Sequence, residues 1–201
     1  MANWFPLIIN TGSSQIQELP SGQNLDLTGS NISNVYAVTI NSGGGTSVIN
    51  GGANATGNIG SSSSYFNRLY ATATTALYAD LAECYLADAA YAPGTVLSFG
   101  GDNEVTVSAT DADPLIVGVV STNPAYTMNS GLTGDHVVSV ALTGRVPCLV
   151  QGPVTRGAMM VSAGNGRARA ESNPAMGTVI GKAVESFTDG NGTIEIVVGR
   201  L

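Results

Sequence analysis

We expect a mainly β protein, in which a β-rich segment and a short helical junction precede a C-terminal β-sandwich or small barrel. The composition favours this class, because 43% of the residues are hydrophobic, only 10% are charged and 26 of 201 are glycine. Such a chain is too apolar for disorder and has too few charged residues for a helical bundle. After residue 35, β-branched residues alternate with small and polar ones between turn residues, as strands require.

Residues 1–35 carry two apolar patches separated by polar turn residues. Neither patch is long enough to form a core, so its side chains are expected to be buried against another copy or a larger assembly. We interpret this region as an attachment segment. The run "FPLII" follows no basic residues and is too short to span a bilayer, which predicts no membrane insertion. The candidate anchoring residues are Trp4, Phe5, Leu7, Ile8 and Ile9.

Residues 36–70 read "YAVTINSGGGTSVINGG" and onward, with short alternations of Val and Ile interrupted by Gly and Asn. Each alternation is too short to be stable as an isolated hairpin. Small residues at this density are expected where several chains wind closely around a common axis. We therefore predict an interwoven β stalk rather than a flexible linker, since linkers seldom contain so much Val and Ile.

Residues 71–92 contain the stretch "ATATTALYADLAECYLADAA", which is rich in Ala and has no Gly or Pro. Leu77, Leu81 and Tyr85 recur four apart, as on one face of a helix. Pro93 and Gly94 then end the stretch. We predict a helix whose apolar face packs between copies of the chain.

Residues 93–201 contain a weak internal repeat. "GTVLSFGG" at 94 matches "GAMMVSAG" at 157, and Gly118 and Gly181 lie in matching words that are also 63 residues apart. The register is lost near the end, because the first half carries about eight extra residues in the polar stretch "STNPAYTMNSGLTGDH". This pattern predicts a duplicated β-meander with halves at about 94–146 and 157–201, and a long loop projecting from one end.

The distribution of charged and metal-binding residues excludes several functions. Seven basic against fourteen acidic residues give a net charge of −7, with no cluster of Lys or Arg, so no nucleic-acid partner is expected. Cys84 and Cys148 lack CxxC spacing and His136 is the single histidine, so we predict no metal site, no cofactor and two reduced, buried cysteines.

Two groups of residues suggest catalysis, and neither forms a complete site. The serines at 61–64 lie upstream of Asp80 and Glu83, but no nearby base would activate a serine. The other group lies in a stretch rich in turn-forming residues, where acidic side chains usually cap their own backbone rather than form the carboxylate pair of a glycosidase. It also lacks the EF-hand spacing required for calcium. We therefore predict no catalytic residues. The members of this second group are Asp102, Asn103, Glu104, Asp111 and Asp113.

Residues 57–101, "GNIGSSSSYFNRLYATATTALYADLAECYLADAAYAPGTVLSFGG", resemble the junction in tail fibres of tailed phages, especially those infecting cyanobacteria, where a stalk meets a globular tip. The words "VGVVSTNPAYTMN", "ALTGRVPCLV" and "GTIEIVVGRL" resemble the C-terminal domain of the same proteins, so the resemblance covers residues 57–201. The start "INTGSSQIQELPSGQNLDLTGSNI" is similar to virion-attachment segments of phage fibre proteins.

The resemblance implies an elongated homotrimeric fibre of a phage virion, made in the host cytoplasm, attached by its N-terminal part and ending in a β knob. Its partners would be two further copies of itself, other virion proteins of the tail, baseplate or neck, and a glycan or protein on the host surface. A short tail or baseplate fibre is our first expectation, and a head or neck decoration fibre is the alternative. A self-cleaving chaperone domain, whose entry the word "YADLAECY" resembles, and a polysaccharide-degrading fibre are the enzymatic alternatives.

The polar stretch at 121–136 is the candidate receptor loop, because recognition residues tend to lie on long loops of a rigid β scaffold. Tyr126 is suited to stacking on a sugar face, and the Asn side chains to bonding its hydroxyl groups. Packing of the loop between protomers remains an open alternative. The candidate residues are Asn123, Tyr126, Met128, Asn129 and His136.

Overall fold

The computed structural model describes residues 7–10, 15–18, 59, 61, 63, 64, 66–68 and 75–199. All regular secondary structure in this part of the chain is β, which confirms the mainly β prediction. The chain divides into two compact units, Met1–Leu69 and Tyr70–Leu201. Among the described residues, no helix is long and apolar enough to cross a membrane.

The first unit contains a two-stranded antiparallel sheet of β1 (Leu7–Asn10) and β2 (Gln15–Glu18). Three of the predicted anchoring residues, those at 7–9, lie in β1, whereas Trp4 and Phe5 lie outside the described residues. Most of the predicted stalk at 36–70 also lies outside them.

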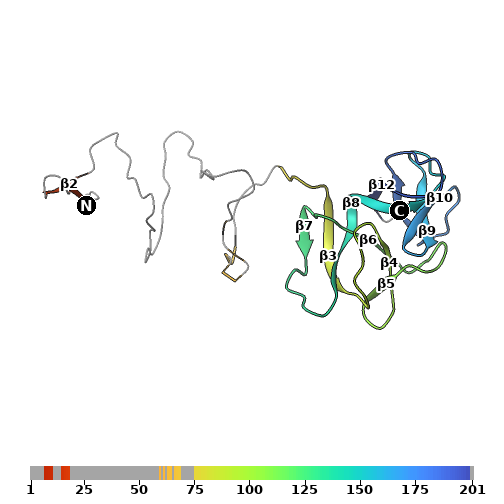
Figure 1. Cartoon of the computed structure of the whole chain (residues 1–201), viewed down its shortest axis with the longest axis horizontal. Coiled ribbons are helices and arrows are strands. Elements are labelled where there is room, and N and C mark those ends of the chain that lie inside the picture. The colour runs from red at the N-terminus through yellow and green to blue at the C-terminus, as the bar shows by residue number, and fades with distance from the viewer. Residues whose placement is uncertain are drawn as a thin grey trace. The chain divides into compact units, whose positions relative to one another are not determined.

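Residues 75–199 of the second unit, the part that the structure describes, contain ten strands (Figure 1). They are β3 (Asp80–Leu86), β4 (Val96–Phe99), β5 (Val105–Val107), β6 (Ile116–Val120), β7 (Tyr126–Met128), β8 (Val137–Gln151), β9 (Met159–Gly164), β10 (Arg167–Glu171), β11 (Val179–Ala183) and β12 (Asn191–Val198).

Nine of these strands close into two small barrels that share the 15-residue strand β8, and β7 pairs with β3 at an edge. The first barrel has the order β3-β8-β6-β4-β5 and is closed by a parallel bridge between Ala87 and Val105. The second has the order β8-β12-β11-β9-β10 and is closed by parallel pairing of Ala168 with Val150. Figure 1 shows β8 passing from the yellow and green strands into the blue ones. We call this arrangement the double barrel.

The strands of the two barrels follow the 63-residue spacing seen in the sequence. β6 and β11 begin at 116 and 179, and the closing contacts have the same offset, 87 to 150 and 105 to 168. Individual backbone bonds repeat as well. The N–H of Gly94 donates to the carbonyl of Val120 at 2.8 Å, and Gly157 donates to Ala183 at 2.8 Å. The duplicated unit therefore starts at β3, upstream of residue 93.

Each barrel interior is filled mainly by aliphatic side chains, most of them Val and Ile. The first barrel buries Leu97, Val105 and Val140, and the second buries Met160, Ile180 and Ile196. Buried positions alternate with more exposed ones along β12, whereas β4, β6 and β9 are each buried at three or more consecutive positions, so that both of their faces are covered. Because both cores include residues of β8, the barrels are joined by a continuous strand rather than by a linker.

The helix predicted over 71–90 is wrong where the structure describes it, since Asp80–Leu86 is strand β3 and residues 75–79 are not helical. A spacing of four residues places side chains on one face of a helix, but it also places them on one face of a strand. Antiparallel pairing with β8 selected the strand. The apolar face also has a partner within the chain, because the ring of Tyr85 meets Phe99 edge-on with centroids 6.1 Å apart.

Candidate functional site

The connection between β6 and β8, residues 121–136, distinguishes the first barrel from the second. We expected a loop throughout, but β7 lies within it and pairs in parallel with β3, with Tyr126 opposite Leu81 and Met128 opposite Glu83. The matching connection between β11 and β12, residues 184–190, contains no strand. The extra residues of the first half are therefore used to add an edge strand to one barrel.

Hydrogen bonds fasten this connection to β3 at several points. The N–H of Ala125 donates to the carbonyl of Asp80 at 2.9 Å, and the amide of Asn129 donates to the carbonyl of Cys84 at 3.1 Å. At the far end, the N–H of Ala87 donates to the carbonyl of His136 at 2.8 Å. The connection is thus braced along the strand.

The five candidate receptor residues differ in what they present to solvent. Tyr126 is 66% exposed, and Asn123 and His136 are also exposed. Met128 is half-buried, and the amide of Asn129 is turned to the carbonyl of β3. Tyr126 is therefore the large side chain that the connection offers to a partner.

Beside the connection lies a cavity of about 330 Å³ that the sequence analysis did not foresee. Asn123 lines it together with Asp80, Ser121, Arg145 and Glu195, which come from four different parts of the double barrel. These four parts are far apart in the sequence and meet only because the strands pair, so the spacing of these residues in the sequence does not indicate the cavity. Asp80 appeared in the sequence only as part of an incomplete catalytic set.

The predicted trimer-junction residues are not gathered on a helical face. Leu77 precedes β3 and is 83% exposed, whereas Leu81 and Tyr85 are half-buried on the face of β3 opposite Ala82 and Cys84. Of the three, Leu77 is the one available to another chain.

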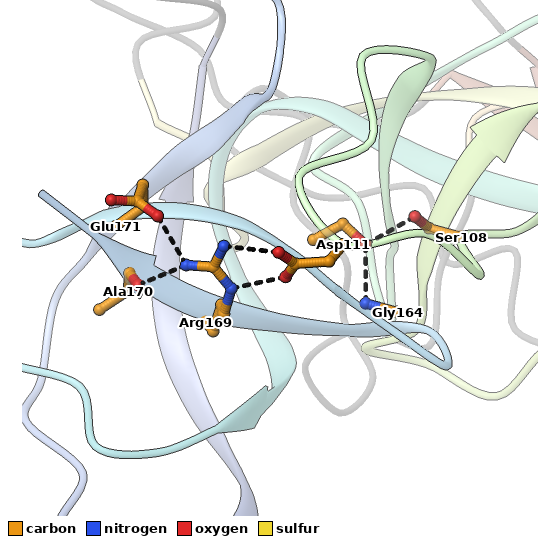
Figure 2. Close-up of polar contacts among 7 residues, drawn as sticks. Ser108, Asp111, Gly164, Arg169, Ala170 and Glu171 are labelled. Atoms are coloured by element: carbon orange, nitrogen blue, oxygen red, sulfur yellow. Dashed lines mark hydrogen bonds and ion pairs between the residues drawn. The ribbon is translucent and has the colours of Figure 1, made fainter. Parts of the chain in front are cut away.

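Asp111, a candidate catalytic or metal-binding acid, is engaged by Arg169 (Figure 2). The guanidinium donates through Nε and Nη2 to the two carboxylate oxygens at 2.6 and 2.8 Å, and through Nη1 to Glu171 at 2.8 Å. The hydrogen bonds from Arg169 lower the pKa of both carboxyl groups and raise that of the guanidinium. Asp111 also forms a bridge with Ala163, so this ion pair joins the first barrel to the second.

Asp113 is buried and accepts three hydrogen bonds. The hydroxyls of Ser98 and Ser108 donate at 2.5 and 3.3 Å, and the N–H of Leu115 donates at 2.9 Å in an Asx-type turn. Ser108 further contacts Ser162 of β9 at 2.7 Å. The carboxylate thus fixes a turn and a seam between barrels.

The remaining chemical candidates have structural contacts of their own. Glu104 accepts from the N–H of Leu86 at 2.7 Å, and Asp102 is exposed. Within the described ranges, no group of three or more His, Cys, Asp or Glu residues is placed to hold a metal ion. Burial raises the pKa of the Cys148 thiol to about 12, which keeps it protonated.

Ser61 and Ser64 form a tight turn, with the N–H of each donating to the carbonyl of the other at 2.9 and 3.3 Å. The hydroxyl of Ser61 also accepts from the N–H of Ser64 at 3.0 Å. These contacts assign both serines to turn formation.

No protein family model matches the chain, and no curated protein matches it. Among solved structures, it is similar to the N base of the head fibre gp8.5 of bacteriophage phi29, at 19% sequence identity and a TM-score of 0.36. The match covers 58% of this chain and 92% of the phage protein.

Proposed function

We propose that the chain is a structural protein of a tailed-phage virion, a short homotrimeric tail or baseplate fibre. Its first unit attaches to other virion proteins, and its double barrel serves trimer assembly and contacts the host surface. The resemblance of residues 57–201 to phage fibre junctions and tips supports this proposal. The trimeric state is taken from that resemblance.

The observation that carries the host-contact role is the insertion found in one barrel and not in the other. Two barrels of the same strand order differ in this connection, where the first adds β7 and exposes Tyr126. Recognition is commonly placed on loops that a rigid scaffold presents. A braced aromatic side chain also loses little conformational entropy on binding.

Solution mass tests the fibre assembly. One chain has a mass of 20.3 kDa, so multi-angle light scattering of the full chain should give roughly three times that value. A single-chain mass at working concentration would contradict the trimer.

Adsorption of assembled particles tests the host contact. We expect Tyr126→Ala to reduce adsorption while the assembled mass stays unchanged. Met176→Ala is the matched control, because Met176 is 97% exposed and lies in the second barrel. Equal adsorption of both variants would remove Tyr126 from the receptor contact.

Antibody labelling of virions in electron microscopy tests the location. Label on the tail or baseplate supports the proposal, and label on the head or neck would favour a decoration fibre.

Intact-mass measurement of the purified chain tests self-cleavage, since a fragment that begins between residues 60 and 90 would contradict a non-enzymatic role. Release of sugars from host polysaccharide would do the same.

A further inference from the structure

We propose that the cavity lined by Asp80, Ser121 and Arg145 binds a neutral polyhydroxylated ligand, a single sugar ring. This inference rests on the proposed function, because it names the chemical class of the host-surface ligand. It adds to the exposed Tyr126 a second contact for that ligand, at the base of the 121–136 connection.

The cavity walls come from separate elements held together by backbone hydrogen bonds. The N–H of Arg145 donates to the carbonyl of Ala79 at 3.3 Å, and the N–H of Ser121 donates to the carbonyl of Ser139 at 2.8 Å. With a volume of about 330 Å³, the cavity lies at the lower end of the range for small-molecule sites, roughly 300–1,000 Å³. It is a preformed space of a size that suits one small ring.

Two polar side chains in this cavity are buried without a hydrogen-bond partner. Asp80 is 5% exposed and Ser121 is 8% exposed. In the described part of the chain, the Oδ2 of Asp80 and the Oγ of Ser121 are the buried side-chain polar atoms that lack a partner. Buried polar groups are nearly always paired in native proteins, so two unpaired atoms at one cavity indicate a site that a bound molecule completes.

The polar lining matches hydroxyl groups, each of which both donates and accepts a hydrogen bond. The carboxylate of Asp80 accepts, the hydroxyl of Ser121 does either, and the guanidinium of Arg145 donates. Among the described residues, no carboxylate forms an ion pair with that guanidinium. The lining therefore offers acceptors and free donors around one space.

An apolar wall completes the set. Pro147 lines the cavity together with Tyr78, a residue that is 47% exposed. The C–H face of a sugar ring is apolar, and aromatic or aliphatic side chains cover such faces while the hydroxyls bond elsewhere.

Other ligand classes fit this lining less well. Asp80 and Glu195 give the cavity lining two acidic side chains and Arg145 gives it one basic side chain, an excess of negative charge that disfavours phosphate. A divalent cation would require a set of ligating side chains that the described residues do not supply. Arg145 likewise disfavours a simple organic cation. A neutral ligand remains.

A titration of the full chain followed by NMR tests this site. The probes are glucose, galactose, mannose and N-acetylglucosamine, with inorganic phosphate and calcium chloride as comparisons. We expect at least one sugar to shift the amide signals of Asp80, Ser121 and Arg145 at millimolar concentration, and the two salts to shift them less. No shift with any sugar, or tighter binding of phosphate or calcium, would overturn the proposal.

Two variants separate binding from stability. Asp80→Asn and Ser121→Ala should each weaken binding of the active sugar by about tenfold, since each removes a hydrogen bond. Their thermal midpoints should be unchanged or higher, because Asp80→Asn replaces a buried carboxylate by a neutral amide and Ser121→Ala removes an unpaired hydroxyl. Asp102→Asn is the control, an exposed acid outside the cavity.

If Asp80→Asn fails to fold, the sugar affinity and thermal midpoint of Ser121→Ala still test the site. A lower midpoint with unchanged sugar affinity would show a structural, water-filled cavity and overturn the proposal.

The outcomes also separate this site from the proposed function. Sugar binding by a chain that is not a virion component would leave the site intact, whereas a trimeric fibre that binds no sugar would remove the site alone.

Discussion

Gly118 and Gly181 occupy the same place in the two barrels, where a Cβ atom on either would collide with a backbone carbonyl oxygen of the neighbouring strand, that of Ala141 or Val197. Backbone cannot move aside as a flexible side chain can. We expect Gly118→Ala and Gly181→Ala each to lower the free energy of unfolding by about 1–3 kcal/mol or more, as for other overpacked sites. Urea denaturation measures the change.

Gly131→Ala is the control for this pair, because a Cβ at Gly131 meets nothing within 4 Å. If Gly118→Ala and Gly131→Ala have the same free energy of unfolding, the close approach of β6 to β8 is contradicted.

The buried carboxylate of Asp113 should be required for stability. Asp113→Ala leaves the hydroxyl of Ser98 and the N–H of Leu115 without their acceptor. We expect a loss of about 1–3 kcal/mol in the free energy of unfolding. The exposed Asp102→Ala provides the comparison, and equal thermal midpoints for the two variants would show that the Asp113 contacts contribute little.

Arg169 should make the stability of the double barrel depend on acid pH. Its hydrogen bonds lower the pKa of Asp111 and of Glu171 in the folded chain. A carboxyl group with a lowered pKa contributes stability above its unfolded-state pKa, and this contribution is lost as the pH falls through the folded-state value. The loss should therefore begin near the ordinary carboxyl pKa, about pH 4, and continue below it.

Arg169→Gln should reduce stability at neutral pH and flatten this acid decline. The Asp111 pair is largely exposed, so its contribution is about 1 kcal/mol or less. Urea denaturation between neutral pH and about pH 3 measures the slope, with Arg156→Gln as the matched exposed arginine. An identical acid slope in both variants would contradict the assignment to Arg169.

Leu77 is the junction residue whose substitution should affect assembly rather than folding. It is 83% exposed, so Leu77→Asp removes no packing within one chain. We expect the mass measured by light scattering to fall from three chains to one at an unchanged thermal midpoint. Met176→Asp, at another exposed apolar residue, should keep the assembled mass. A trimeric Leu77→Asp variant would place the interface elsewhere.

Much of the double barrel could be predicted from local patterns. Short runs of Val and Ile between turn residues mark strands such as β6 and β11, and β6 is buried at four consecutive positions, 117–120. The duplication is also visible in the sequence, because Gly118 and Gly181 lie 63 residues apart in similar short stretches. β3 was misassigned because four-residue spacing fits both periods, and only its pairing with β8 distinguishes them.

The sequence by itself determined the β class, the 63-residue repeat and the position of the extra residues at 121–136. Tertiary structure decided which side chains meet. Asp111 and Arg169 are 58 residues apart, and Asp80 faces the same cavity as Ser121. Alternation is a property of each strand alone, whereas contacts between strands depend on register and barrel closure, which no short stretch of sequence encodes.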